Sequence, residues 1–348
     1  MRKKINISSI KKILLIRLRP IGDIVMTTPA IKILRDEFPD AFISYLIEPP
    51  YIELVENHPN INEVLVLRRD WTFNEFLKFI KKVRNRDYDL LIDFHCGPRA
   101  SLISFLSNAK LKIGFKVKYR HFVYDIKVPR KKENGYYHSV ESHINLVKAI
   151  GIKDLTYEEI PSLNLPSPSE EERQKIEKFM NDNNLLKYKK IVLHISAGNE
   201  YRDWGIKNIA ELIQLFSKNS EIKVILVGDN KDRRAEKAIY EKVGNNFLSL
   251  VAQINLMELR ELISRSNLFI GSDSGPMHIA ATTSTPIVAL FGPTSPAIFG
   301  PWKAKARIIE KEFNCRPCRQ KKCIYRDFRC LRTITPEEVY KASVDMLE

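Results

Sequence analysis

The 348-residue sequence lacks any apolar run that approaches the roughly 18 residues needed to cross a bilayer. The N-terminal segment, MRKKINISSIKKILLIRL, has too short an apolar core for a signal peptide. Neither the GxGxxG nor the GxxxxGK[ST] nucleotide-binding fingerprint occurs. Cysteine is scarce, and the five present do not suggest the disulfide framework of a secreted protein. These absences favour a globular, cytoplasmic protein.

The positive charge of the chain is large and unevenly spread. The formal net charge is +15 at pH 7, and basic residues gather in residues 1–20, 110–132 and 301–332. This clustering favours an anionic partner such as a phosphorylated lipid, an anionic membrane or nucleic acid; the alternative is a lysine-rich, solvated surface. Because no RNA-binding aromatic signature, zinc-finger spacing or basic recognition helix is apparent, nucleic acid is not a predicted partner.

Short apolar runs alternate with segments of helical periodicity along the chain. Alternation of this kind is typical of a mostly parallel sheet that is covered by helices on both faces. Helices are predicted at residues 23–38, 74–86, 138–150, 170–181 and 335–347. Strands are predicted at residues 12–18, 42–47, 64–67, 90–94 and 111–115, and again at 190–195, 224–227, 248–251, 268–270 and 287–290.

A break in this alternation of strands and helices separates two halves of the chain. Residues 160–169, IPSLNLPSPS, contain three prolines and three serines and form the predicted linker. We therefore predict an α/β protein with two doubly wound domains, joined by this linker, and an active site in the cleft between them. The predicted boundaries are 1–165 for the first domain, 166–334 for the second and 335–348 for a terminal helix.

The stretch 268–293, LFIGSDSGPMHIAATTSTPIVALFGP, holds the first candidate site. Its pattern predicts a strand, a tight turn, a helix and a second strand. Glycines such as Gly275 let the backbone approach a ligand, and the first amides of the helix can bind an anion such as a diphosphate. His278 lies one turn into that helix and can reach the same anion. The alternative is that Asp273 and Ser274 merely cap the helix and that His278 is a structural partner.

The loop after the first predicted strand, RLRPIGD, ends in a second candidate residue. Gly22 allows a close turn that presents Asp23 at the carboxyl end of the strand. A carboxylate at this place can act as a general base toward an acceptor hydroxyl. The alternative is that Asp23 is the N-cap of the following helix.

Two loops in the second half offer polar side chains at equivalent places. Ser196 follows the strand at residues 190–195 and can contact a ligand, and Arg202 can donate hydrogen bonds to phosphate oxygens. Trp204 is expected to pack under the next helix. Asp232 can accept hydrogen bonds from ribose hydroxyls, or it is a solvated acid at a helix start.

Four cysteines near the C-terminus share the spacing C-x2-C-x4-C-x6-C. Such a group can bind zinc or an iron–sulfur cluster, although the spacing matches neither common zinc fingers nor ferredoxins. Buried thiols or a structural disulfide are the alternatives. The four are Cys315, Cys318, Cys323 and Cys330, whereas Cys96 is expected to be a small apolar residue near a strand end.

Taken together, these stretches resemble glycosyltransferase family 9, the ADP-heptose:lipopolysaccharide heptosyltransferases. The resemblance covers nearly the whole chain. Its most specific parts are IGDIVMTTPA, which starts at Ile21, and GSDSGPMH, which starts at Gly271. The segment FGPT at 291–294 and the cysteine-containing tail with ITPE at 334–337 are similar to the heptosyltransferase II type.

The resemblance implies a GT-B fold, in which two Rossmann-like, doubly wound domains face each other across a cleft. It implies the acceptor in the N-terminal half and the nucleotide-sugar in the C-terminal half. It also implies an inverting transfer that uses no catalytic metal and no cofactor, with Asp23 as the base that takes the acceptor proton. A cation and helix amides would stabilise the leaving diphosphate. The implied donor-binding residues are Ser196, Arg202, Asp232, Asp273, Ser274, Gly275 and His278.

Two positions depart from the family pattern, since Arg202 replaces the usual lysine and Asp232 replaces the usual ribose-binding glutamate. We expect an enzyme that moves heptose from ADP-heptose to the lipopolysaccharide inner core. Its acceptor would be an anionic phosphorylated lipid, and it would contact the cytoplasmic face of the inner membrane peripherally. A different nucleotide-sugar or acceptor, or a non-catalytic module that binds nucleotides or anionic lipid, are the alternatives.

Overall fold

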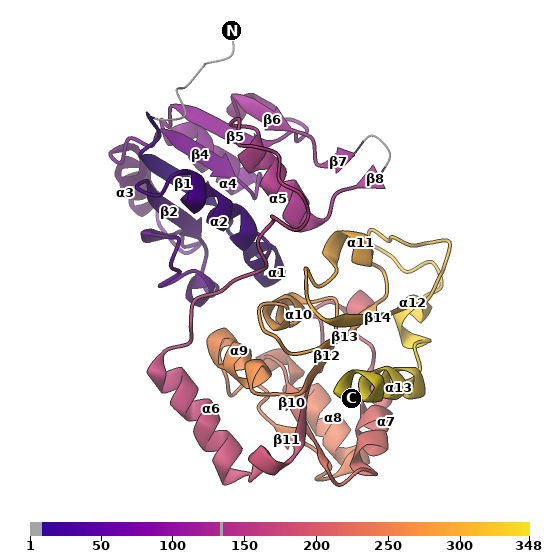
Figure 1. The fold of residues 1–348 in the computed structure, drawn as a ribbon. Helices are drawn as coiled ribbons and strands as arrows, with labels where there is room; N and C mark the ends of the chain where they lie inside the picture. Colours follow the sequence, from indigo (N-terminus) through magenta and orange to yellow (C-terminus); the bar gives the residue numbers. More distant parts are fainter. Residues whose placement is uncertain (1–8, 133–134) are drawn as a thin grey trace. The chain divides into compact units, whose positions relative to one another are not determined.

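The chain folds into two compact units, the first ending at Pro166 and the second running from Ser167 to Glu348 (Figure 1). The computed structural model describes residues 9–132 and 135–348. The boundary between the units falls inside the stretch rich in proline and serine at residues 160–169. Each unit is built around a six-stranded sheet, and a small antiparallel ladder joins β7 (Lys131–Lys132) to β8 (Gly135–Tyr136).

The first sheet has the strand order β3-β2-β1-β4-β5-β6, and its neighbouring strands are all parallel. The chain direction across the sheet reverses between β1 and β4. In open α/β sheets, ligands bind at the carboxyl ends of the strands beside such a reversal. The strands are β1 (Lys12–Ile16), β2 (Phe42–Ile47), β3 (Glu63–Val66), β4 (Leu90–Asp93), β5 (Leu111–Phe115) and β6 (Ile126–Val128).

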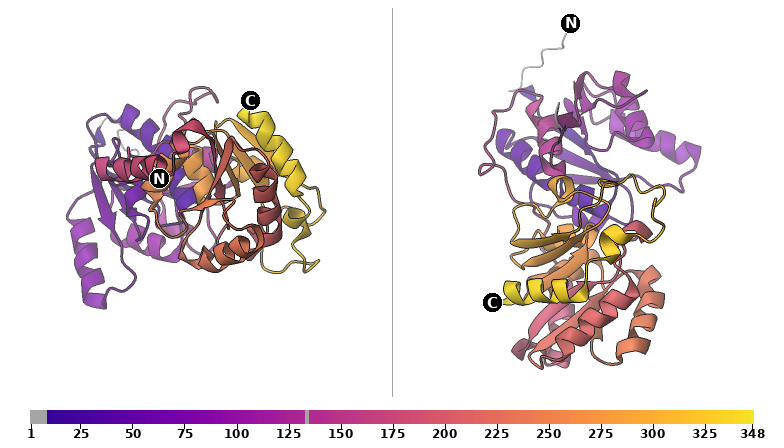
Figure 2. Two further views of the ribbon diagram at one scale, coloured as in Figure 1. Left: turned by 90° about the horizontal axis from the view of Figure 1, so that it is seen from below. Right: turned by 90° about the vertical axis from the view of Figure 1, so that its right-hand side faces the viewer.

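Helices cover both faces of the first sheet (Figure 2, right). On one face, α3 (Phe73–Arg84) and α4 (Pro98–Leu106) pack against the strands and form a single apolar core with them. On the other face, α2 (Thr28–Glu37) packs beside α5 (Ser139–Lys148) (Figure 1). Right-handed crossovers place helices on opposite faces when the chain moves in opposite directions across the sheet. The 3₁₀ segments η2 (Ile52–Leu54) and η3 (His121–Val123) also belong to this unit.

The single helix predicted at residues 23–38 is wrong, because the structure contains α1 (Ile21–Val25) and then α2. Pro29 has no backbone N–H with which to bond the Val25 carbonyl, so the first helix cannot continue through it. The Thr28 hydroxyl donates to the Val25 carbonyl at 2.8 Å instead. The break leaves the short helix α1 directly behind the loop that carries the candidate base.

The second sheet repeats the same topology, with the order β11-β10-β9-β12-β13-β14 and parallel neighbours throughout. Its reversal lies between β9 and β12. The edge strands β6 and β14 were not predicted because their side chains are largely half-exposed or exposed and give no continuous apolar run. The strands are β9 (Lys189–His194), β10 (Ile222–Val227), β11 (Leu248–Ser249), β12 (Leu268–Ser272), β13 (Ile287–Phe291) and β14 (Ala306–Glu310).

A large apolar core joins this sheet to its helices. Trp204 is buried in it, as predicted, and its indole N–H donates to the Ile334 carbonyl at 2.8 Å. The last helix, α13, packs on α7 within this unit. The helices are α6 (Glu170–Asp182), α7 (Ile206–Ser217), α8 (Arg233–Val243), α9 (Leu256–Ser264), α10 (Gly275–Ala280), α11 (Pro296–Phe299), α12 (Arg329–Arg332) and α13 (Pro336–Leu347), with η4 (Leu185–Lys187), η5 (Glu200–Arg202) and η6 (Asn230–Asp232) as 3₁₀ segments.

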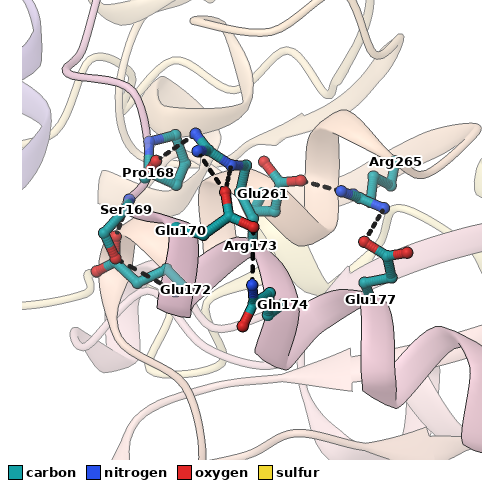
Figure 3. A network of polar contacts seen from close by, with 9 residues as sticks. All are labelled: Pro168, Ser169, Glu170, Glu172, Arg173, Gln174, Glu177, Glu261 and Arg265. Carbon is teal, nitrogen blue, oxygen red and sulfur yellow. Dashed lines mark hydrogen bonds and ion pairs between the residues drawn. The ribbon is translucent and has the colours of Figure 1, made fainter.

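Polar contacts fix the first helix of the second unit onto the unit's core (Figure 3). Ser169 and Glu172 form a capping box at the start of α6, which satisfies backbone N–H groups that no helical carbonyl reaches. From α9, Arg265 pairs with Glu177 of α6 at 3.8 Å. At the helix start, Asn255 of the same unit donates to the Glu172 carboxylate at 3.0 Å, so α6 is tied to α9 near both of these positions.

Candidate active site

The turn after β12 lies at the reversal of the second sheet. Ser274 stands at the N-cap position of α10, and Gly275 begins the helix, but no side chain makes a capping bond there. The alternative that the side chains of Asp273 and Ser274 merely cap this helix is therefore wrong. The Ser274 hydroxyl instead lies 3.4 Å from Nδ1 of His194, at the end of β9. The first amides of α10 are not satisfied by a capping side chain and can serve a ligand.

The structure brings three of the predicted residues together around one buried carboxylate. Arg202 donates from Nη1 to the Asp273 carbonyl at 3.0 Å, and the same nitrogen lies 3.5 Å from Asp273 Oδ2. Nε2 of His278 lies 3.8 Å from Asp273 Oδ1. Asp273 and His278 are buried, and Arg202 is partly exposed. Among the described residues, the buried Nε of Arg202 has no hydrogen-bond partner. Arg202 thus presents a cation and a spare donor beside the α10 turn.

Asp232 lies at the neighbouring strand end, after β10. Its carboxylate accepts the backbone N–H of Asp229 at 2.8 Å and forms a capping box with it, and the side chain is buried. A Cβ added to Gly228 would lie 2.5 Å from Oδ2 of Asp232, so glycine is required for this close approach. The alternative of a solvated acid at a helix start is wrong about the solvation, because Asp232 belongs to a capping box but is buried.

His194 links the two strand ends, and sequence reasoning did not single it out. Burial lowers the pKa of His194 to about 4, although the carboxylates of Asp232 and Asp229 favour its protonation. The imidazole is therefore neutral near pH 7 and can exchange a hydrogen bond with Ser274. Ser196, two residues further on, accepts the Gly198 N–H at 3.3 Å. Its hydroxyl hydrogen is available to a ligand.

The candidate base lies at the reversal of the first sheet. Asp23 is in the first turn of α1, whose N-cap is Pro20, so the alternative of an N-cap aspartate is wrong. Its carboxylate forms an ion pair with Arg17, and 27% of its side chain is exposed. Arg17 is buried, and its Nη1 donates to the Phe94 carbonyl at 2.7 Å. Arg17 therefore ties the candidate base to the end of β4.

His95 and Arg130 stand beside this ion pair, and neither was predicted. Burial and the nearby cations Arg17 and Arg19 lower the pKa of His95 to about 4, so its ring is neutral near pH 7. Burial also lowers the pKa of Arg130, whose guanidinium lies 4.5 Å from the Phe115 ring centroid. His95 follows a predicted strand directly, which is the same signal that identified Asp23. No sequence signal identifies Arg130.

A buried network holds His95 in place. The Asp93 carboxylate accepts the backbone N–H groups of His95 at 2.9 Å and Cys96 at 2.7 Å. It also accepts the hydroxyls of Tyr124 at 2.6 Å and Ser104 at 3.1 Å. Burial raises the pKa of Asp93, and these four hydrogen bonds oppose that shift. The β4–α4 turn is thereby fixed in one geometry.

The four C-terminal cysteines, like Cys96, are free thiols. Burial would raise the pKa of Cys323, but the nearby backbone N–H groups of residues 325–328 outweigh it and lower this pKa. Across residues 9–132 and 135–348, no three His, Cys, Asp or Glu side chains are arranged to hold a metal ion. Within the same described residues, no helix is both long enough and apolar enough to cross a membrane.

Two compact units, each built on a parallel sheet with the same strand order and with polar side chains at its reversal, fit the GT-B fold. The family model for glycosyltransferase family 9 (heptosyltransferase) matches residues 76–328. The chain belongs to this family and is a glycosyltransferase.

Individual relatives agree with this assignment. The Escherichia coli lipopolysaccharide heptosyltransferase 3 is 26% identical over 296 residues, which are 81% of this chain and 83% of that protein. A family 9 glycosyltransferase structure from Veillonella parvula has a TM-score of 0.83 at 24% identity and covers 97% of both chains. The structure of the E. coli ADP-heptose LPS heptosyltransferase II has a TM-score of 0.79 at 24% identity, covering 97% of this chain and 98% of that one. The predicted family and fold class are confirmed.

Proposed function

We propose that the protein transfers heptose from ADP-heptose to the inner core of lipopolysaccharide, with inversion at the anomeric carbon and with Asp23 as the general base. The observation that carries the proposal is the family 9 match, together with relatives whose names specify lipopolysaccharide heptosyltransferases. The polar clusters at the two sheet reversals support it, because they offer the two halves of such a reaction: a base for an acceptor and a cation for a diphosphate.

The donor end is assigned to the second unit. Arg202 and the first amides of α10, at Gly275, face the diphosphate and stabilise the charge that develops on it as the glycosidic bond breaks. Ser274 and Ser196 offer hydroxyls to the phosphate oxygens. Asp273 orients Arg202, whose Nη1 donates to the Asp273 carbonyl, and His278 lies beside the same carboxylate and the donor phosphates. Asp232, at the end of β10, accepts the ribose hydroxyls. This assignment needs no catalytic metal, because the protein itself supplies the positive charge.

The acceptor end is assigned to the first unit. The acceptor hydroxyl gives its proton to the Asp23 carboxylate as its oxygen attacks the anomeric carbon. Arg17 holds that carboxylate in position. Among the described residues, the buried Nε of Arg17 and Nδ1 of His95 have no hydrogen-bond partner, so both atoms can bind acceptor oxygens. Arg130 adds positive charge beside them, which suits an anionic, phosphorylated acceptor.

In our proposal the acceptor is a lipid. The enzyme would therefore work as a peripheral protein at the cytoplasmic face of the inner membrane. The basic stretches of the sequence at residues 110–132 and 301–332 support contact with anionic lipid.

A calorimetric titration with ADP, UDP, GDP and CMP, without added divalent metal, tests the donor assignment. We expect ADP to bind most tightly. A preference for another nucleotide would leave the family assignment intact but would show that the donor is not ADP-heptose. Binding of none would contradict the donor site as assigned, and would favour a module that binds lipid but does not transfer sugars.

A further inference from the structure

Large exposed apolar side chains gather on one outer surface of the first unit. Among the described residues, fourteen large apolar side chains are exposed, and six of them belong to α3, α4 and the segment around η3. Phe105 is 57% exposed and Phe122 is 69% exposed. We name this surface the outer helical face, and its six members are Phe73, Leu77, Leu102, Phe105, Tyr119 and Phe122.

The packing of the helices explains why these side chains lie together. Helices α3 and α4 turn their inner sides, with residues such as Phe79 and Ile103, onto the first sheet. They contact each other, and α4 also contacts η3. Leu102 and Phe105 are three positions apart on α4, so they project from the same outer side of that helix. Helices α2 and α5, which cover the opposite sheet face, contribute no exposed large apolar residue.

Positive charge surrounds these apolar side chains. On α3, Lys78, Lys81 and Lys82 are exposed, together with one acidic residue, Glu75. Lys118 is also exposed, and its ammonium lies 4.8 Å from the centroid of the Tyr119 ring. Helix α4, PRASLISFL, and residues 116–124, KVKYRHFVY, contain no acidic residue. The outer helical face therefore combines aromatic and aliphatic side chains with a net positive charge.

This combination identifies the occupant by its chemistry. Aromatic side chains that protrude beside lysines suit the boundary between lipid headgroups and acyl chains, where the rings enter the apolar layer and the ammonium groups meet anionic headgroups. Protruding apolar side chains on neighbouring elements are typical of an interaction surface. We propose that the outer helical face docks the enzyme on an anionic lipid bilayer. The inference rests on the proposed function in one respect, namely that the acceptor is anchored in a membrane.

Co-sedimentation with vesicles of equimolar phosphatidylethanolamine and phosphatidylglycerol tests the proposal. We expect the full-length protein to bind these vesicles and to bind pure phosphatidylcholine vesicles much less. The double variant Phe105→Ser/Phe122→Ser should lose about tenfold or more in vesicle binding, because two exposed rings no longer enter the lipid. The control variant is Leu186→Ser in the second unit, where the leucine is 75% exposed, and its binding should be unchanged.

Charge reversal at Lys78 and Lys81 gives an independent test. The double variant Lys78→Glu/Lys81→Glu should bind the anionic vesicles less than the wild type does. Added salt should lower vesicle binding by the wild type toward the level of this variant. Thermal unfolding of all the variants should match the wild type, since every replaced side chain is exposed.

Several outcomes would overturn the docking proposal. They are absence of vesicle binding by the wild type, equal binding to neutral vesicles, or full binding by the Phe105→Ser/Phe122→Ser variant. A dimer that this variant dissociates would assign the face to a second copy of the chain instead. Titration with ADP on the same samples separates the two proposals. Vesicle binding without ADP binding would leave docking in place and contradict the donor site, whereas ADP binding without vesicle binding would do the reverse.

Discussion

Replacement of Asp23 by asparagine removes the candidate base while keeping the size of the side chain. The asparagine amide oxygen can still accept a hydrogen bond from Arg17, which is itself held by the Phe94 carbonyl at 2.7 Å, so the loop should keep its geometry. Loss of a general base lowers the rate by about 10²–10⁴-fold. That range corresponds to about 3–5 kcal/mol of lost transition-state stabilisation. The ion pair is partly exposed, so its loss should change the free energy of unfolding by only ~1 kcal/mol.

The assay is the steady-state release of ADP from ADP-heptose in the presence of lipopolysaccharide that lacks heptose. We expect kcat to fall by about two to four orders of magnitude in the Asp23→Asn variant. The Kd for ADP, measured by calorimetry, should stay unchanged, because the donor is assigned to the other unit. The control is Asp36→Asn on α2, where the aspartate is 58% exposed and pairs with Lys32. Turnover by Asp23→Asn within about threefold of the wild type would refute Asp23 as the base.

Three further predictions concern the second unit and the buried histidines. Arg202→Ala should weaken ADP binding by about tenfold or more, because a charge-assisted contact to the diphosphate is lost. Arg202→Lys should keep most of the affinity, and the control Arg234→Ala, at an exposed site on α8, should keep all of it. An ADP affinity of Arg202→Ala equal to that of the wild type would contradict the role of Arg202. Phe216→Ala should lower the free energy of unfolding in urea by about 3–5 kcal/mol, since the ring is fully buried in the core of the second unit; a change well below ~1 kcal/mol would contradict that packing. In the folded protein, burial lowers the pKa of His143 to about 3 and that of His194 to about 4, below the ordinary value of 6.5. Below pH 6.5 the unfolded chain therefore binds more protons than the folded protein. The free energy of unfolding should consequently fall as the pH drops from 6.5 toward 4. Urea midpoints that do not decrease between pH 7 and pH 5 would contradict the buried, neutral state of both rings.

The candidate site could be predicted in part because a strand end is visible in the sequence. Asp23, Ser196, Asp232 and Asp273 each follow an apolar run, and each lies at or near the carboxyl end of its strand in the structure. What the sequence could not predict is which side chains meet. Arg17 reaches the Phe94 carbonyl across 77 positions of the chain, a contact that depends on the pairing of β1 with β4.

The fold was predicted well where burial is complete and poorly where it is not. Strands such as β13, with all five residues buried, give an unbroken apolar run that is easy to recognise. The edge strand β14 has mostly exposed or half-exposed residues, so no such run appears. The division between α1 and α2 depends on Pro29 and on one hydroxyl bond from Thr28, a local detail that the apolar period does not report. The missing side-chain cap on α10 is likewise decided by tertiary contacts, because Ser274 turns toward His194 instead.

The central claim is that this family 9 member transfers heptose from ADP-heptose to a lipopolysaccharide acceptor. The most direct test is to incubate the purified protein with ADP-heptose and heptose-deficient lipopolysaccharide, and to analyse the released lipid oligosaccharide by mass spectrometry. We predict that the acceptor gains the mass of one heptose residue and that ADP is released in equal amount. An acceptor that stays unchanged with ADP-heptose, but gains a sugar from a different nucleotide-sugar, would contradict the account.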